Sequence, residues 1–126
     1  MSGKRSRTKG ANWERKVAND FKEIMPGCGA RRGLQFQGGV VPDVDVVQFW
    51  PECKVGKAPP LLPALNQARR DLKEAEDLAG SPLGRIPIAI VKRNAKSGHE
   101  KPEEVVVIGY SDFKELIKEW WERGQA

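Results

Sequence analysis

Four charged residues lie within one strand-like stretch, VVPDVDVVQFWPECKVG, at residues 40–56. Asp43 and Asp45 are two positions apart, and so are Glu52 and Lys54. Because side chains two apart in an extended chain share one face, each pair points the same way. Charges in an apolar run are costly to bury without a chemical or ionic partner. The stretch is therefore the first candidate for a reactive site.

A hairpin within this stretch would bring its charges together. We predict a two-residue turn at residues 48–49, which places Asp43 opposite Lys54 and Asp45 opposite Glu52. Three carboxylates and an ammonium then share one patch. Such hard oxygen donors suit Mg²⁺, which takes a few carboxylates together with waters and substrate phosphate oxygens. The ion would activate water, while the lysine would stabilise charge on the phosphate. The other face of the hairpin, expected in the core, carries Val44, Val46 and Cys53.

A plainer interpretation stays open, in which Glu52 and Lys54 form a solvent-exposed pair of little energetic value. The other reactive residue types are weaker candidates. His99 is the single histidine, and we interpret it as a surface residue of a polar loop. Cys28 and Cys53 form neither a CxxC metal pair nor a disulfide framework, so we interpret them as small core residues in a reducing environment.

The elements that must position this stretch follow from hydrophobic periodicity. Apolar residues at helical spacing from Trp13 to Ile24 predict a first helix over about residues 10–25. Glu14 lies at the edge of this apolar stripe, so we expect it to face inward. Apolar runs predict strands at residues 28–36, 40–49, 50–55, 86–92 and 103–110, and helical spacing predicts further helices near residues 65–79 and 111–124.

The expected order of elements is thus α, β, β, β, α, β, β, α. It indicates a mixed sheet flanked by helices, in the α/β or α+β class. We expect Ser111 to cap the last helix, whose apolar stripe includes Trp120 and Trp121. Two tryptophans at this position are typical of a core or a subunit interface, and we favour a dimer contact.

Charge is unevenly distributed along the 126 residues, which hold 22 Lys and Arg against 17 Asp and Glu. Nine of these bases and three of the acids lie in residues 1–32, which favours a polyanionic partner. We expect a flexible basic arm at residues 1–9 and a single domain at residues 10–126. The sequence has neither a signal peptide nor a membrane-length apolar run, so we expect a soluble, cytoplasmic protein.

The pattern PD followed by ECK on the next strand resembles the PD-(D/E)xK nuclease superfamily. More specifically, KGANWERKVANDF followed by ARRG, PDVDV, ECKVG and LNQARRDL is similar to the archaeal-type Holliday junction resolvases and their phage relatives. The resemblance spans about residues 9–75. It implies a restriction-endonuclease-like core, in which a mixed sheet follows a helix.

The resemblance also implies roles for individual residues. The implied catalytic residues are Glu14, Asp43, Glu52, Lys54 and Gln67. The implied metal ligands are Glu14, Asp43, Glu52 and the backbone carbonyl of Cys53. The resemblance matches Arg15 and one of Arg31 or Arg32 to residues that contact phosphate. The charge pattern adds Lys4, Arg5, Arg7, Lys9 and Lys57 to the residues expected to contact DNA. A wider phosphate track or an ordinary solvated helix face would be formed by Arg69, Arg70 and Lys73.

Two features of the chain depart from the family pattern. Residues 33–42 contain no serine, so Gln35 or Gln37 would have to replace the family's loop serine. The gap between Asp43 and Glu52 is short, which demands a tight hairpin and makes Asp45 a candidate extra ligand.

By this resemblance the protein is a Mg²⁺-dependent endonuclease, in which Mn²⁺ substitutes for Mg²⁺. It would act on branched DNA as a homodimer and resolve four-way junctions by paired symmetric nicks. The resemblance implies neither a small-molecule cofactor nor a membrane partner. Two alternatives stay open: another PD-(D/E)xK nuclease of flap, mismatch or restriction type, and a non-catalytic DNA-binding module.

Overall fold

The computed structural model describes residues 3–33, 40–95 and 101–125, and its elements follow one another in the expected order. In the described residues these elements are α1 (Gly3–Ile24), β1 (Arg31–Arg32), β2 (Val44–Asp45), β3 (Phe49–Gly56), α2 (Leu61–Ala79), β4 (Ile86–Arg93), β5 (Glu103–Ile108) and α3 (Tyr110–Gly124). The chain has a mixed α/β architecture, compatible with the α+β class.

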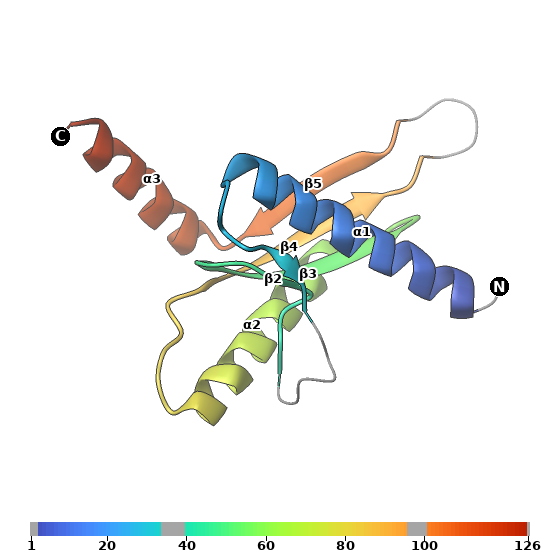
Figure 1. Ribbon diagram of the computed structural model, residues 1–126, viewed down its shortest axis with the longest axis horizontal. Helices are drawn as coiled ribbons and strands as arrows, with labels where there is room; N and C mark the ends of the chain where they lie inside the picture. The colour runs from blue at the N-terminus through green and yellow to red at the C-terminus, as the bar shows by residue number, and fades with distance from the viewer. Residues whose placement is uncertain (1–2, 34–39, 96–100, 126) are drawn as a thin grey trace.

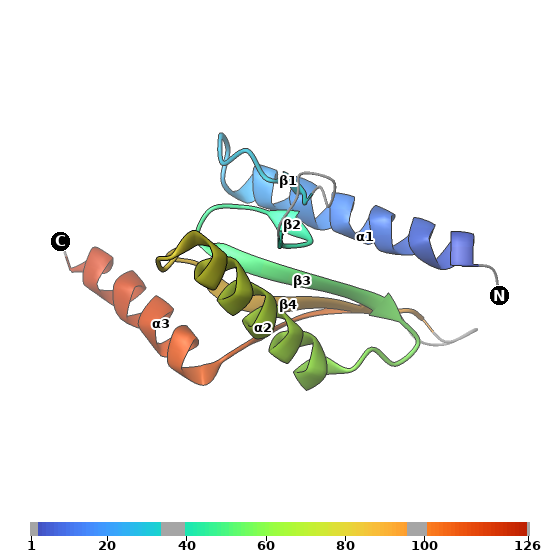
Figure 2. The same cartoon turned by 90° about the horizontal axis from the view of Figure 1, so that it is seen from below.

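The central sheet has the order β3–β4–β5 among the described strands. β3 and β4 run parallel and are joined by α2, the crossover that a parallel pair requires, while β5 runs antiparallel to β4. β1 and β2 form a short antiparallel pair next to β3. α1 covers one face of the sheet and α2 covers the other, which gives three layers (Figures 1 and 2).

The face of α1 that meets the sheet is the predicted one. Trp13, Val17 and Ala18 are buried against β2 and β4, and the indole N–H of Trp13 donates a hydrogen bond of 3.1 Å to the carbonyl of Ile90. This bond satisfies the polar atom of a buried tryptophan. The stripe weakens toward the end of the helix, where Ile24 is exposed.

α2 also follows its sequence pattern. Its buried side is made of small and medium apolar residues, Ala64, Leu65, Ala68, Leu72 and Ala75. Alanines at this spacing let the helix approach the sheet closely, and the Trp50 ring fills the space against them. The helix ends at Gly80, which adopts a left-handed conformation (φ 74°) and donates its N–H to the carbonyl of Glu76.

Three expectations about element boundaries are wrong. α1 begins at Gly3, so from that residue on the expected flexible arm of residues 1–9 is helical. The strand expected at residues 28–36 comprises Arg31–Arg32, with residues 34–39 lying outside the described part. α3 is preceded by Gly109 as its cap residue, not by Ser111, and has no side-chain cap.

α3 differs from the other helices because none of its described residues is buried. It extends away from the layered part of the molecule (Figures 1 and 2). Among the described residues no helix is long and apolar enough to cross a membrane.

Candidate active site

The turn between β2 and β3 decides which charges meet. Val46 bridges Phe49, so the turn residues are 47–48 rather than the expected 48–49, and Gln48 takes the left-handed conformation (φ 72°) that this turn needs. The Asp43 N–H donates to the carbonyl of Pro51 at 3.1 Å. Asp43 therefore lies beside residues 51–53, and the expected pairing with Lys54 is wrong.

The Asp43 side chain is anchored to the backbone of β3. Its Oδ2 atom accepts a hydrogen bond of 2.8 Å from the Cys53 N–H. In an extended strand the N–H and C=O of one residue point to the same edge, so the Cys53 carbonyl faces the same edge as this bond. A carboxylate and a backbone carbonyl are thus presented together at the edge of β3.

Glu52 and Lys54 complete the motif on β3. Glu52 is 6% exposed, and its Oε1 atom lies 3.2 Å from the Lys54 ammonium, which is half-buried. This is not the solvated surface pair of the plainer interpretation, because one partner is buried. The ammonium is nevertheless open enough to water to reach a second anion.

α1 contributes Glu14 to the same region. Glu14 is half-buried, and its Oε1 atom lies 3.5 Å from Nε of Arg32 on β1. The negative charge of Asp43 raises the pKa of Glu14, which indicates that the two carboxylates are close. Helix, short strand and central strand therefore converge at one edge of the sheet.

Burial and mutual repulsion raise the pKa values of these carboxyl groups above their ordinary range. Burial and then the Asp43 charge raise the pKa of Glu52 to about 7, although Lys54 opposes the shift. Burial also raises the pKa of Asp43, against the opposing effects of the Cys53 N–H and Lys54. For Glu14, burial and Asp43 raise the pKa while Arg32 opposes them. A bound cation would relieve this repulsion.

Cys53 is not a nucleophile in this setting. Burial and the charges of Asp43, Glu14 and Glu52 raise the pKa of its thiol, which stays protonated. The side chain packs against the core cluster under α1, together with Val44 and Val46, as expected. Cys28 also packs against this cluster.

Asp45, two residues from Asp43, does not join the site. Its backbone pairs with Arg31, and its Oδ1 atom lies 3.1 Å from Nη1 of Arg85. The Arg85 guanidinium in turn lies over the Trp50 ring. The expected convergence of three carboxylates from this stretch is therefore wrong, since Asp45 has a structural ion pair instead.

Asp71 on α2 belongs to the site and was missed by the sequence interpretation. It is half-buried, and its negative charge raises the pKa of both Asp43 and Glu52. The available signal was its position one helical turn after Gln67, which places both on one side of α2. Gln67 is also half-buried, at the margin of the buried face of α2.

The expected DNA-contacting residues lie around this edge and along α1. Arg7, Lys9, Arg15, Arg31 and Lys57 are exposed. Lys4 and Arg5 belong to α1, but their side chains lie outside the described part, as do Gln35, Gln37 and His99 entirely.

A basic pocket of about 280 Å³ lies on the sheet-facing side of α1, where β3 and β4 end. Its polar lining comes from Lys9, Asn12, Lys16, Lys92 and Asn94. The ammonium groups of Lys16 and Lys92 each lie 5.7 Å from the Trp13 ring centroid. Lys16 is already ion-paired with Asp20 and Glu104, so the donors for a phosphate group come from Lys9, Lys92 and the two amides.

The donor set at the β3 edge fits Mg²⁺ in kind. Among the described residues no three His, Cys, Asp or Glu side chains are gathered into a ready ligand cluster, and Asp43 and Glu52 each engage a donor of β3. Mg²⁺ does not need such a cage, because one or two carboxylates with waters and substrate phosphates suffice. Asp43, Glu52 and the Cys53 carbonyl would be its ligands.

No protein-family model, no curated protein and no solved structure matches this chain. The functional argument therefore depends on the residues of the site and their geometry.

Proposed function

We propose that the protein is a Mg²⁺-dependent DNA endonuclease of the PD-(D/E)xK type that resolves four-way junctions. One observation carries the proposal. Asp43, Glu52 and Lys54 lie together at one edge of β3, and Glu14 is brought to them by α1. The order of α1, the three following strands, α2 and β4 supports the restriction-endonuclease-like core in the proposal.

The residues of the site divide the work of phosphodiester hydrolysis. When bound, Mg²⁺ supplies Lewis-acid chemistry, which means polarising the phosphate and activating water. Asp43 and Glu52 bind the cation and fix its position through their own contacts with β3. The Lys54 ammonium, held by Glu52, donates hydrogen bonds to the scissile phosphate and stabilises the charge that develops there.

The basic groups place the substrate backbone over this edge. Arg32 on β1 is held beside the site by its ion pair with Glu14. Arg15, the next residue on α1, is exposed to solvent. Such phosphate contacts position DNA without specifying sequence, so the preference of this enzyme is for junction shape. Paired nicks need two sites and the domain carries one, so the active form is a homodimer.

The proposal is tested by cleavage of a labelled four-way junction, beside duplex, flap and single-stranded controls, with Mg²⁺ and with EDTA. We expect paired symmetric nicks in the junction, with Mg²⁺ alone. The Asp43→Asn variant should lose at least about a hundredfold in rate while still binding the junction, because the ligand is lost but the basic residues remain.

Asp45→Asn is the matched control. It removes the same charge at a position two residues further along, where the side chain is paired with Arg85 and not with the site. Its cleavage rate should stay near that of the wild type. Equal rates for the Asp43→Asn variant and the wild type would overturn the site assignment. Cutting of every substrate alike would leave a general nuclease of the same type, and binding without cutting would leave a DNA-binding module.

A further inference from the structure

The apolar side of α3 is not covered by the core of the described residues. Tyr110 and Trp120 are 74% and 72% exposed, and Trp121 is 61% exposed. No described residue of α3 belongs to any of the three core clusters. A contiguous aromatic surface of this kind on a soluble domain marks an interaction site.

This surface is an ordered stripe and not scattered exposure. Its members recur at helical spacing on one side of α3, namely Tyr110, Phe113, Leu116, Ile117, Trp120 and Trp121. Buried aromatic side chains contribute 150–250 Å² each, so the four aromatics of the stripe expose on the order of 500 Å². A standard interface buries about 800 Å² per partner, and the stripe alone supplies more than half of that.

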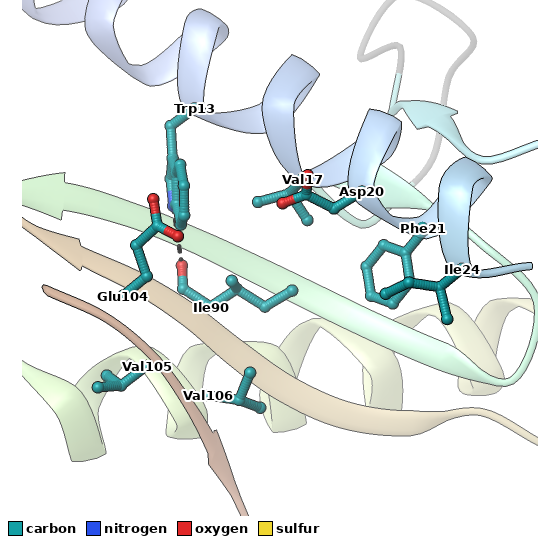
Figure 3. Close-up of a pocket in the computed structure, with 9 residues that line it drawn as sticks. All are labelled: Trp13, Val17, Asp20, Phe21, Ile24, Ile90, Glu104, Val105 and Val106. Carbon is teal, nitrogen blue, oxygen red and sulfur yellow. Dashed lines mark hydrogen bonds between the residues drawn. The ribbon is translucent and has the colours of Figure 1, made fainter.

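A second apolar surface, partly open to solvent, lies between α1 and β5. It is an open groove of about 240 Å³ toward which Trp13, Val17, Phe21 and Ile24 of α1 point (Figure 3). Its opposite wall is formed by Ile90 and Val106, which are paired across β4 and β5, whereas the neighbouring Val105 packs with the cluster against α2. Ile24 and Val106 are mostly exposed, and β5 is the last of the described strands of its sheet. The groove thus has the apolar lining that a helix stripe needs.

The α3 of the same chain is directed away from this groove. Gly109, which precedes α3, lies against the guanidinium of Arg69 on α2. α3 therefore leaves the sheet on the α2 side, whereas the groove opens on the α1 side (Figure 2). Within one chain, the helix would have to reverse across the edge of β5 to enter it.

We propose that α3 of one copy lies in the α1–β5 groove of a second copy, so that two chains exchange these helices reciprocally. Each chain then covers both of its apolar surfaces with the same contact, as a two-fold interface requires. The acidic groups at the groove, Asp20 and Glu104, are already paired with Lys16 of their own chain, so the apolar area of the stripe, and not charge, supports the arrangement. This inference rests on the proposed function, because the need for a dimer comes from paired nicks, which require two active sites.

The test is the oligomeric state of the full chain, measured without DNA by sedimentation velocity. We expect the wild type to be a dimer. Trp120→Gln combined with Trp121→Gln, and separately Val106→Lys, should each weaken the dimer on the order of a hundredfold, because both remove buried contacts. Circular dichroism confirms that each variant is folded, and Glu115→Ala on the outer side of α3 is the control that stays dimeric.

Mixing the two monomeric variants gives the decisive result. In a reciprocal exchange, one of the two contacts is intact in the mixed dimer, so heterodimers should form more readily than either variant dimerises alone. Pairing of α3 with α3 predicts that Val106→Lys stays dimeric, and a monomeric wild type means that α3 does not bind a second copy. Either outcome overturns the exchange.

Failure of this inference is distinct from failure of the proposed function. A monomer that still cuts DNA in Mg²⁺ would contradict the proposed exchange of α3 and support the proposed nuclease activity. A dimer of the expected kind that cuts no substrate would do the reverse.

Discussion

At the scale of single residues, Asp43 and Asp45 demonstrate how position decides the role of a carboxylate. Both lie in one short segment with identical chemistry. Asp43 accepts a hydrogen bond from the Cys53 N–H and lies near Glu52, while Asp45 is paired with Arg85, the residue before β4. The sequence predicted that carboxylates gather here, but the choice between the two aspartates depended on the position of the turn.

Glu52 should make the metal-free protein less stable as pH rises. Its pKa is about 7 in the folded chain and 4.5 in the unfolded chain, so the folded state binds more protons between these values. The contribution of Glu52 to the free energy of unfolding is therefore most favourable below about pH 4.5 and is lost as the pH rises through about 7. A shift of this size corresponds to a cost on the order of 3 kcal/mol at pH 8.

The measurement is urea unfolding in EDTA at pH 5 and pH 8. Glu52→Gln, which cannot ionise, should raise the free energy of unfolding at pH 8 relative to the wild type and reduce the difference between the two pH values. Glu74→Gln, an exposed residue of α2, is the control and should leave both values unchanged. An equal pH dependence in Glu52→Gln and wild type would show that another group is responsible.

At the scale of elements, α2 and β4 could be predicted because their apolar residues follow a clear period. α2 buries the alanines and leucines that its sequence spacing indicated, and β4 is a continuous apolar run between two covered faces. The turn at residues 47–48 could not be predicted, since Val47 and Gln48 lack the glycine or asparagine that usually marks a left-handed turn position.

The start of α1 was missed for a different physical reason. Residues 3–9 have no apolar stripe, so periodicity gives no helix signal there. Lysine and arginine are nevertheless good helix formers, and they extend a helix that Trp13 and Val17 already anchor on the sheet. Helix propensity can therefore extend a packed helix through residues that carry no apolar stripe.

Two glycines of these helices should respond in opposite ways to alanine. Gly10 lies inside α1 and a Cβ there would meet nothing within 4 Å, so Gly10→Ala should stabilise the protein by about 0.5–1 kcal/mol. Gly80 also has open space, but its φ of 74° disfavours any side chain, and Gly80→Ala should destabilise by about 1–2 kcal/mol. Thermal unfolding of both variants tests the pair, and changes of the same sign would contradict it.

At the scale of the whole molecule, sequence indicated a dimer contact at the tryptophan pair but could not indicate that all of α3 stands apart from the core. An amphipathic stripe has the same spacing whether it covers its own sheet or a partner, so composition does not distinguish the two. The exposed fractions of Trp120 and Trp121 show that this stripe does not cover its own sheet. The basic character of α1 was likewise apparent from charge, whereas the pocket it forms with β4 required the fold, because Lys9 and Lys92 are far apart in sequence.

This pocket allows a last prediction about how the molecule holds DNA. Lys9→Ala combined with Lys92→Ala should weaken binding to junctions of any sequence to a similar degree, because phosphate contacts carry no sequence information. If each lysine neutralises one phosphate, the slope of log affinity against log salt should fall by about 1.8. The control is Lys22→Ala combined with Lys101→Ala, which removes equal charge from two exposed lysines that do not line the pocket. Fluorescence anisotropy from 50 to 300 mM salt in EDTA measures both slopes, and equal losses in the two double variants would mean that net charge, not the pocket, holds the DNA.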